Sequence, residues 1–456
     1  MRERRRRPLL MATGFVVVGT AAQLLRQPGS HVWDTVWAED GSLYTSDALS
    51  HPALITIGRG YNGYVQVLPR LLALGTRLVP TARISTYLAF SAALVTSLLG
   101  LVVVRSAQGW IRSTPLRWCL GLMTVLAPAA YFEVNVNLAN LGWPMLVASF
   151  WAIASRQEGR ADLAVRIVVV VLTALTTSVA VVLVPWAVLV VALRRQRRDV
   201  ILGSAFGVAV VVQALADAST AAVQPPGGWQ LGYVAKSYVA RVLGSVAIGE
   251  RWIPSLWISH PQVLMVGSTL IVLAVAAAGI VFNLRRPPPA TPDDRVPSTS
   301  DRGSVPSTAV RSALGRLRFD RWWLAGGAAL LSLVIYVATT WIRGAAQVGL
   351  TTSLGQFSEG GSRYLYVPVL LLFSALVVLA DGTDRRWLQY GFVAWTVVVV
   401  VSSLRLGTLR SHGPSWAAGV VTARATCQAH PGLSSVQVPT SPGPGWFVTL
   451  PCSRVR

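Results

Sequence analysis

The chain has 456 residues, of which 53% are hydrophobic and only 13% are charged, and its mean hydropathy is +0.53. An ordinary soluble domain has about 25% charged residues. This balance excludes a soluble enzyme, a disordered chain and a fibrous repeat, and it indicates a protein whose solvent is mostly lipid. The net charge of +22 comes from short basic clusters between apolar runs. That arrangement is typical of membrane topology, so we expect no nucleic-acid partner.

The N-terminus joins a basic segment, residues 2–7, to an apolar run that ends near residue 25. A cleaved signal peptide is one interpretation of this pattern. We favour an uncleaved first span, because the run is long and has no clear small-x-small cleavage site. The basic end should then stay in the cytoplasm.

One apolar stretch, 167–193, has 27 residues, which is too long for one upright span and too short for two. Its centre, 176–178, is polar, and arginines flank both ends. We therefore predict two short or re-entrant helices here. The other apolar stretches are 84–104, 118–132, 141–155, 199–216, 262–284, 322–342, 364–380 and 387–404.

Together these runs predict an all-α polytopic membrane protein with about 11 membrane helices. The arginines place the N-terminus in the cytoplasm and the C-terminus outside the plasma membrane. We expect an N-terminal membrane half at 1–284 and further membrane helices at 322–404. Between them, 285–321 is rich in Pro, Ser, Asp and Arg and predicts a disordered cytoplasmic linker. A small extracytoplasmic tail follows at 405–456.

The three cysteines divide between a span and the tail. Cys119 lies in an apolar run, whereas Cys427 and Cys452 lie in the tail. An oxidising exterior favours a disulfide between the two tail cysteines, and we predict one. The spacing alone leaves two unpaired thiols as the alternative.

The first outer loop, 26–83, concentrates acids among tryptophans and tyrosines. Carboxylates can act as a general base or hold a divalent cation. We expect Asp34 and Asp47 to cap helices. For the adjacent pair Glu39 and Asp40 we predict a functional role.

Two further features of this loop concern its surface. Residues 64–78 have apolar positions at helical spacing with Arg70 and Arg77, which predicts an amphipathic helix on the outer membrane surface. The aromatic residues, Trp37 among them, can stack on sugar rings or anchor the loop at the interface.

The second outer loop is short and polar, with Glu133, Asn135, Asn137 and Asn140 between two apolar runs. Polar groups at a membrane boundary are expected to face a cavity or a partner. Asparagine amides both donate and accept hydrogen bonds, as hydroxyl-rich ligands require. Capping of helix ends is the alternative for each asparagine.

Arg363, followed by Tyr364, enters a late span from its outer end, against the positive-inside bias. A planar guanidinium suits phosphate recognition. The alternative is an arginine that snorkels to the interface. A helix-like segment at 231–248 is a second candidate for contact with lipid headgroups.

Sequence motifs for nucleotide and hydrolase chemistry are missing. The chain has no P-loop, no G-x-G-x-x-G after a strand, no H-E-x-x-H and no G-x-S-x-G. Energy coupling through a nucleotide is therefore not expected.

These features resemble the GT-C superfamily of integral-membrane glycosyltransferases. The resemblance rests on Trp-Ala-Glu-Asp-Gly at 37–41, on Glu-Val-Asn-Val-Asn at 133–137 and on Ser-Arg-Tyr at 362–364. It extends over about residues 1–404 and includes many membrane helices, an acidic first outer loop and a surface helix after it. The composition, rich in Arg with a single Lys, resembles that of a high-GC actinobacterium.

The resemblance implies transfer of one sugar from a polyprenyl-phosphate donor to a cell-envelope glycan, lipid or protein on the outer face, with inversion. Asp40, or less readily Glu39, would be the base, and Arg363 would offset the charge of the phosphate. The resemblance implies substrate contacts for a further group of residues, which are Tyr364, Glu133, Asn135, Asn137 and Trp37. Some relatives use a divalent metal, but no ligand set can be named in this sequence.

Two other functions stay open. One is an envelope lipid or polysaccharide transporter, which should carry ionisable residues at mid-membrane and internal repeat symmetry. The sequence shows neither feature. The other is a non-catalytic subunit of an envelope assembly, which would not need a Glu-Asp pair and an arginine on the same side.

Overall fold

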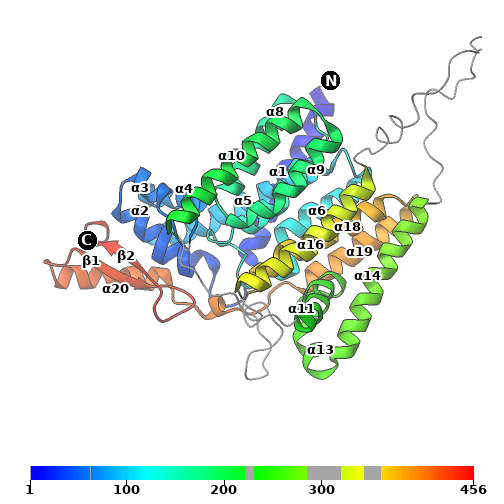
Figure 1. The fold of residues 1–456 in the computed structure, drawn as a ribbon. Helices are drawn as coiled ribbons and strands as arrows, with labels where there is room; N and C mark the ends of the chain where they lie inside the picture. Colours follow the sequence, from blue (N-terminus) through cyan, green and yellow to red (C-terminus); the bar gives the residue numbers. More distant parts are fainter. Residues whose placement is uncertain (1, 62, 221–230, 285–319, 344–360, 384) are drawn as a thin grey trace, which may run out of the picture.

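Most of the chain is helical in the computed structural model (Figure 1). The structure describes residues 2–61, 63–220, 231–284, 320–343, 361–383 and 385–456. Most of the predicted linker, 285–319, and most of the loop before Arg363 therefore lie outside the described residues.

The predicted apolar stretches all form helices. Those of the N-terminal half are α1 (Arg2–Leu25), α5 (Ile84–Ala107), α6 (Thr114–Leu126), α7 (Gly142–Ala154), α8 (Arg160–Ala174), α9 (Val184–Arg194) and α10 (Arg197–Thr220). Those of the C-terminal half are α14 (Pro261–Leu284), α16 (Arg321–Arg343), α18 (Arg363–Asp381) and α19 (Arg386–Ser402).

Among the described residues, five helices are long and apolar enough to cross a membrane, namely α5, α10, α14, α16 and α18. This is the composition of a helical membrane protein. Others are shorter: α7 has 13 residues, which is about 20 Å of helix. All of its residues are buried, and it packs against α5, α8 and α18, so it forms the centre of the bundle. The number of crossings stays a prediction.

The break predicted inside 167–193 is confirmed. Helix α8 ends at Ala174, Thr177 has an extended backbone, and a 3₁₀ turn, η6 (Ser178–Leu183), leads into α9. Arg166 of α8 and Arg194 of α9 both pair with Asp199 of α10, at 3.6 and 3.3 Å. Helices α8 and α9 therefore form a hairpin that begins and ends on the same face of the bundle.

Short helices fill the loops. The first outer loop contains η1 (Val32–Asp34), η2 (Asp40–Thr45), α2 (Ser46–Ser50), α3 (Ala53–Gly58), α4 (Val67–Leu74), η3 (Gly75–Leu78) and η4 (Thr81–Arg83). Later come η5 (Pro128–Ala130), α11 (Leu231–Ser237), η7 (Tyr238–Leu243), α12 (Gly244–Ala247) and α13 (Ile253–Ser259). The tail contains η8 (Leu409–His412), α20 (Trp416–Ala429), β1 (Ser435–Pro439), β2 (Phe447–Pro451) and η9 (Cys452–Arg454).

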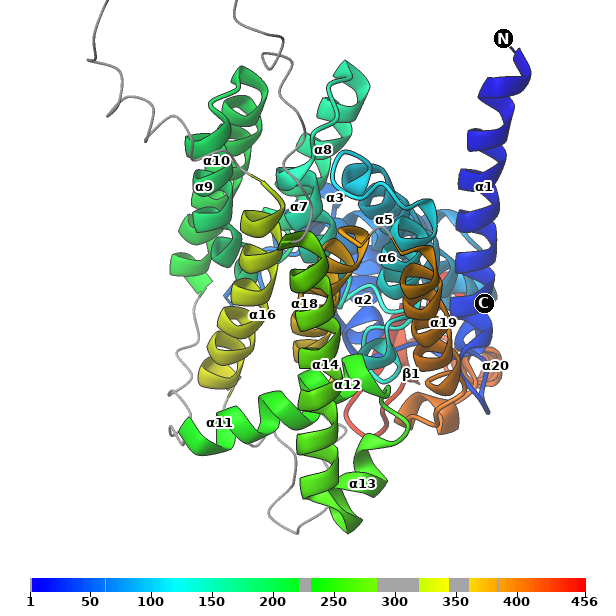
Figure 2. The same ribbon diagram turned by 90° about the vertical axis from the view of Figure 1, so that its right-hand side faces the viewer.

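The tail packs on the first outer loop. Strands β1 and β2 pair antiparallel, and the Ser441 amide donates to the Val36 carbonyl while the Ala38 amide donates back to Ser441. A disulfide joins Cys427 and Cys452, with their Cα atoms 5.6 Å apart. Figure 2 shows the tail at the end of the bundle opposite the N-terminus. Which end faces the cytoplasm stays a prediction.

The predicted amphipathic helix exists as α4 followed by η3, but one of its arginines is not on a polar surface. Arg70 is 1% exposed and donates to the Asp47 carboxylate at 2.9 Å and to the Thr56 carbonyl at 3.1 Å. Asp47 also pairs with Arg59 at 3.1 Å. The expected capping role of Asp47 is therefore wrong, because its side chain is used in ion pairs within the loop.

Candidate functional site

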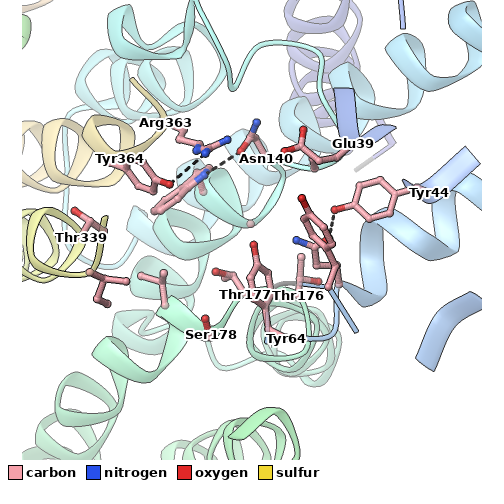
Figure 3. Close-up of a pocket in the computed structure, with 17 residues that line it drawn as sticks. Glu39, Tyr44, Tyr64, Asn140, Thr176, Thr177, Ser178, Thr339, Arg363 and Tyr364 are labelled. Atoms are coloured by element: carbon pink, nitrogen blue, oxygen red, sulfur yellow. Dashed lines mark hydrogen bonds between the residues drawn. The ribbon is translucent and has the colours of Figure 1, made fainter. Parts of the chain in front are cut away.

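A cavity of about 150 Å³ lies where the first outer loop, the second outer loop and the hairpin break meet (Figure 3). Helices α16 and α18 complete its wall with Thr339 and Arg363. The side chains of the loops and the break that line the cavity include Glu39, Tyr44, Tyr61, Tyr64, Gln66, Asn140, Trp143, Thr176, Thr177 and Ser178.

Glu39 lines this cavity and is the last residue before the π-helical turn η2. Its side chain is half-buried, and it makes no hydrogen bond or ion pair with any described residue. Figure 3 shows it beside Asn140 and on the same side of the cavity as Arg363. A carboxylate in such a position is available to a ligand.

Arg363, the first residue of α18, is held by Glu133. Its guanidinium lies 3.5 Å from one Glu133 oxygen, and its backbone amide donates to the other at 3.3 Å. Burial raises the pKa of Glu133, and the charge of Arg363 opposes that shift. The guanidinium also donates to the Tyr364 hydroxyl at 3.2 Å. Glu133 thus orients the arginine without itself lining the cavity.

Asp40 is fixed within the protein and does not line the cavity. It is 2% exposed, and its two oxygens accept the backbone amides of Leu138 and Ala139, each at 2.9 Å. Burial raises the pKa of Asp40 to about 7, although both amides and the nearby charge of Arg410 favour the carboxylate. Its two accepted hydrogen bonds attach the first outer loop to the second.

Arg410, in η8 of the tail, lies near Asp40 and is not among the residues that the sequence predicts for the site. It is 4% exposed and donates to the Thr35 hydroxyl and carbonyl, each at 2.9 Å, and to the Val136 carbonyl at 2.8 Å. Val136 has φ +56°, which is unfavourable for a β-branched residue. Nothing local distinguishes Arg410 from the other arginines of the chain, because its partners are all far away in sequence.

Besides Glu133, three predicted contact residues do not line the cavity. Trp37 is 6% exposed and forms a backbone bridge with Ser441 of the tail. Asn135 donates to the Gln23 carbonyl at 3.3 Å, and Asn137 accepts the Asn140 amide at 3.3 Å. Of the second-loop asparagines, it is Asn140 that lines the cavity.

Asp34 acts as the predicted cap, but on a distant helix. Its oxygens accept the Ser415 hydroxyl at 2.6 Å and the Ala417 amide at 2.9 Å, at the N-terminus of α20. A carboxylate there satisfies free amides and complements the helix dipole.

The hydroxyl groups at 176–178 were visible in the sequence only as a polar interruption. In the structure they form the wall opposite Arg363, with Tyr64 beside them (Figure 3). The break places them there because a helix that ends at mid-protein exposes backbone and side-chain polar groups to the space beyond it.

A second, apolar cavity of about 300 Å³ adjoins the first, between η6, α10 and α16. Both cavities are lined by Thr177, Ser178 and Thr339. Gln213 of α10 also lines the apolar cavity; it is 4% exposed, and neither polar atom of its amide has a hydrogen-bond partner among the described residues.

Within the described part of the chain, no three His, Cys, Asp or Glu side chains gather closely enough to hold a metal ion. No family model, curated protein or solved structure matches the chain. The site is therefore interpreted from its own geometry.

Proposed function

We propose that the protein is a membrane glycosyltransferase that moves a sugar from a polyprenyl-phosphate donor to an acceptor hydroxyl on the outer face. The observation that carries this proposal is Glu39, a half-buried carboxylate without a partner among the described residues, in one cavity with Arg363. A base and a phosphate-binding cation are the two groups that such a transfer needs.

Glu39, and not Asp40, is the base in this proposal. Both Asp40 oxygens accept backbone amides, so that side chain cannot turn toward an acceptor without breaking them. Glu39 removes the proton from the acceptor hydroxyl, whose oxygen then bonds to the anomeric carbon. The bond from that carbon to the phosphate oxygen breaks, and polyprenyl phosphate leaves with the electron pair. Attack opposite the leaving group inverts the anomeric configuration.

Arg363 would offset the negative charge of the leaving phosphate. Its rigid fork suits phosphate oxygens, and the ion pair with Glu133 limits its motion. The apolar cavity that adjoins the polar one supports a lipid-linked donor, since a prenyl chain needs an apolar site beside the polar site. Thr177, Ser178 and Thr339 belong to the walls of both cavities, so the two lie side by side.

The hydroxyls of Thr176, Thr177 and Ser178 and the ring of Tyr64 would contact the sugars. Hydroxyl groups donate and accept hydrogen bonds, and an aromatic face packs on the apolar face of a sugar ring. No metal-dependent step is part of the proposal.

The experiment measures transfer of labelled sugar in membranes that contain the protein, from synthetic polyprenyl-phosphate mannose, glucose and arabinose in parallel. Glu39→Gln keeps the side-chain volume but removes the basicity, and transfer should fall roughly 10²–10⁴-fold. The matched control is Glu158→Gln, an exposed acid in the loop between α7 and α8, which should transfer normally.

Arg363→Ala should lower transfer and also weaken retention of the labelled donor, because the arginine binds the donor phosphate in this proposal. Thermal unfolding of every variant is recorded, so that a misfolded variant is not counted as inactive. Normal transfer by Glu39→Gln would reject Glu39 as the base. If the wild type binds the donor and moves it across the membrane without transferring the sugar, the result would favour a transporter.

A further inference from the structure

A third cavity lies far from the candidate site, between α14 and α19. Its volume is about 360 Å³, and its wall is apolar apart from Thr383, two residues after the end of α18. Figure 2 shows α14 and α19 on the face of the bundle turned toward the viewer. We propose that this groove binds an acyl chain of an anionic phospholipid, whose phosphate lies against Arg385 and Arg386 at one end.

Small residues make the groove. Ala274 and Ala278 lie four positions apart on one side of α14, and Gly391 faces them from α19. A Cβ atom added at Gly391 would meet no other atom within 4 Å, so the space in front of it is open. On α19 the groove extends from Trp387 to Trp395, which is about 12 Å of helix.

The surroundings of the groove are apolar and exposed. Helix α14 is one of the five potential spans, and only 22% of its most apolar window is buried. Leu270 and Leu273 beside the groove are 61% and 58% exposed, and Trp387 at its end is 68% exposed. Such an apolar surface is stable in contact with lipid but unfavourable in contact with water. A straight acyl chain fits the short groove better than a membrane helix, which packs over several turns.

The positive charge at one end of the groove indicates which class of lipid would bind there. Arg385 and Arg386 directly precede Trp387, both are exposed, and neither makes an ion pair with a described residue. Asp384 lies outside the described residues. Guanidinium groups bind phosphate oxygens well, and the arginine pattern predicts that this end of α19 is cytoplasmic, where anionic lipids are concentrated. Two arginines should therefore discriminate against a zwitterionic headgroup.

Native mass spectrometry of the full chain, with phosphatidylglycerol or phosphatidylcholine of the same acyl length, tests this site. The wild type should retain phosphatidylglycerol about tenfold better or more, as two arginines near an anionic headgroup allow. Arg385→Gln with Arg386→Gln should remove that preference. Gly391→Leu should fill the groove and reduce retention of both lipids.

Each variant has a matched control. Gly267→Leu adds the same side chain to α14 where a Cβ also meets no atom within 4 Å, but outside the groove. Arg195→Gln with Arg197→Gln removes two exposed arginines from another cluster. Both controls should keep the wild-type preference, and thermal unfolding verifies the fold of each protein.

Equal retention of the two lipids by the wild type would overturn the proposal, as would unchanged retention by Gly391→Leu. A change in oligomeric state on filling the groove would show that a second protein helix occupies it instead. Because the measurement involves no sugar transfer, its outcome is independent of the proposed function.

Discussion

The first outer loop contributes to the wall of the candidate cavity and also to a buried cluster beside it, the anchor. The two regions differ in whether their carboxylates are hydrogen-bonded within the protein. In the anchor, which we define as Asp40, Arg410 and the amides of Leu138 and Ala139, the hydrogen bonds of the carboxylate are made within the protein. In the cavity wall, the carboxylate of the neighbouring residue Glu39 makes no hydrogen bond with a described residue. Groups satisfied by the protein stabilise it, whereas a polar group left without a partner in a cavity is a candidate for function.

The largest expected effect on stability separates these two regions directly. Arg410→Met keeps an apolar stem but leaves the carbonyls of Thr35 and Val136 without their donor and removes the positive charge near Asp40. Leaving buried acceptors without their donor costs roughly 1–3 kcal/mol each in the free energy of unfolding. Glu39→Gln should change it by only about 0.5 kcal/mol. Thermal unfolding in detergent measures both, and a comparable loss at Glu39 would contradict the distinction.

The disulfide of the tail should contribute somewhat less. Replacing both Cys427 and Cys452 by Ala should lower the free energy of unfolding by about 2–4 kcal/mol, since the unfolded chain regains the freedom of a closed loop. The tail supports the loop that carries the anchor, so transfer should fall in parallel with stability. Mild reduction of the wild type should reproduce the loss. A stable but inactive double variant would instead assign the tail a direct role in the site.

The pH dependence of stability gives a second test of the anchor. The pKa of Asp40 is raised from 3.8 to about 7, so the folded state binds this proton more tightly than the unfolded state. The stabilising contribution is complete below pH 3.8 and is lost as the pH rises to about 7. Compared with Asp40→Asn, the unfolding midpoint of the wild type should fall across this window and level off above it. Parallel pH profiles of the two proteins would show that Asp40 does not titrate there.

Much of the architecture follows from the sequence because hydropathy and helical periodicity are local properties. The apolar stretches all became helices, and three polar residues at 176–178 marked the break between α8 and α9. The concentration of acids in the first outer loop likewise located the candidate site. The residues alone thus determine the chemical type of the candidate site and its approximate position in the chain.

Only the tertiary structure decided what each of those residues does. Neighbouring positions in a helical turn point about 100° apart, so Glu39 can face the cavity while Asp40 faces the second loop. Arg410 meets Val136 across 274 positions of sequence, and Asp47 finds Arg70 across 23. These partners are brought together by packing between distant segments. No local pattern encodes that packing, because each contact depends on where the whole chain places both residues.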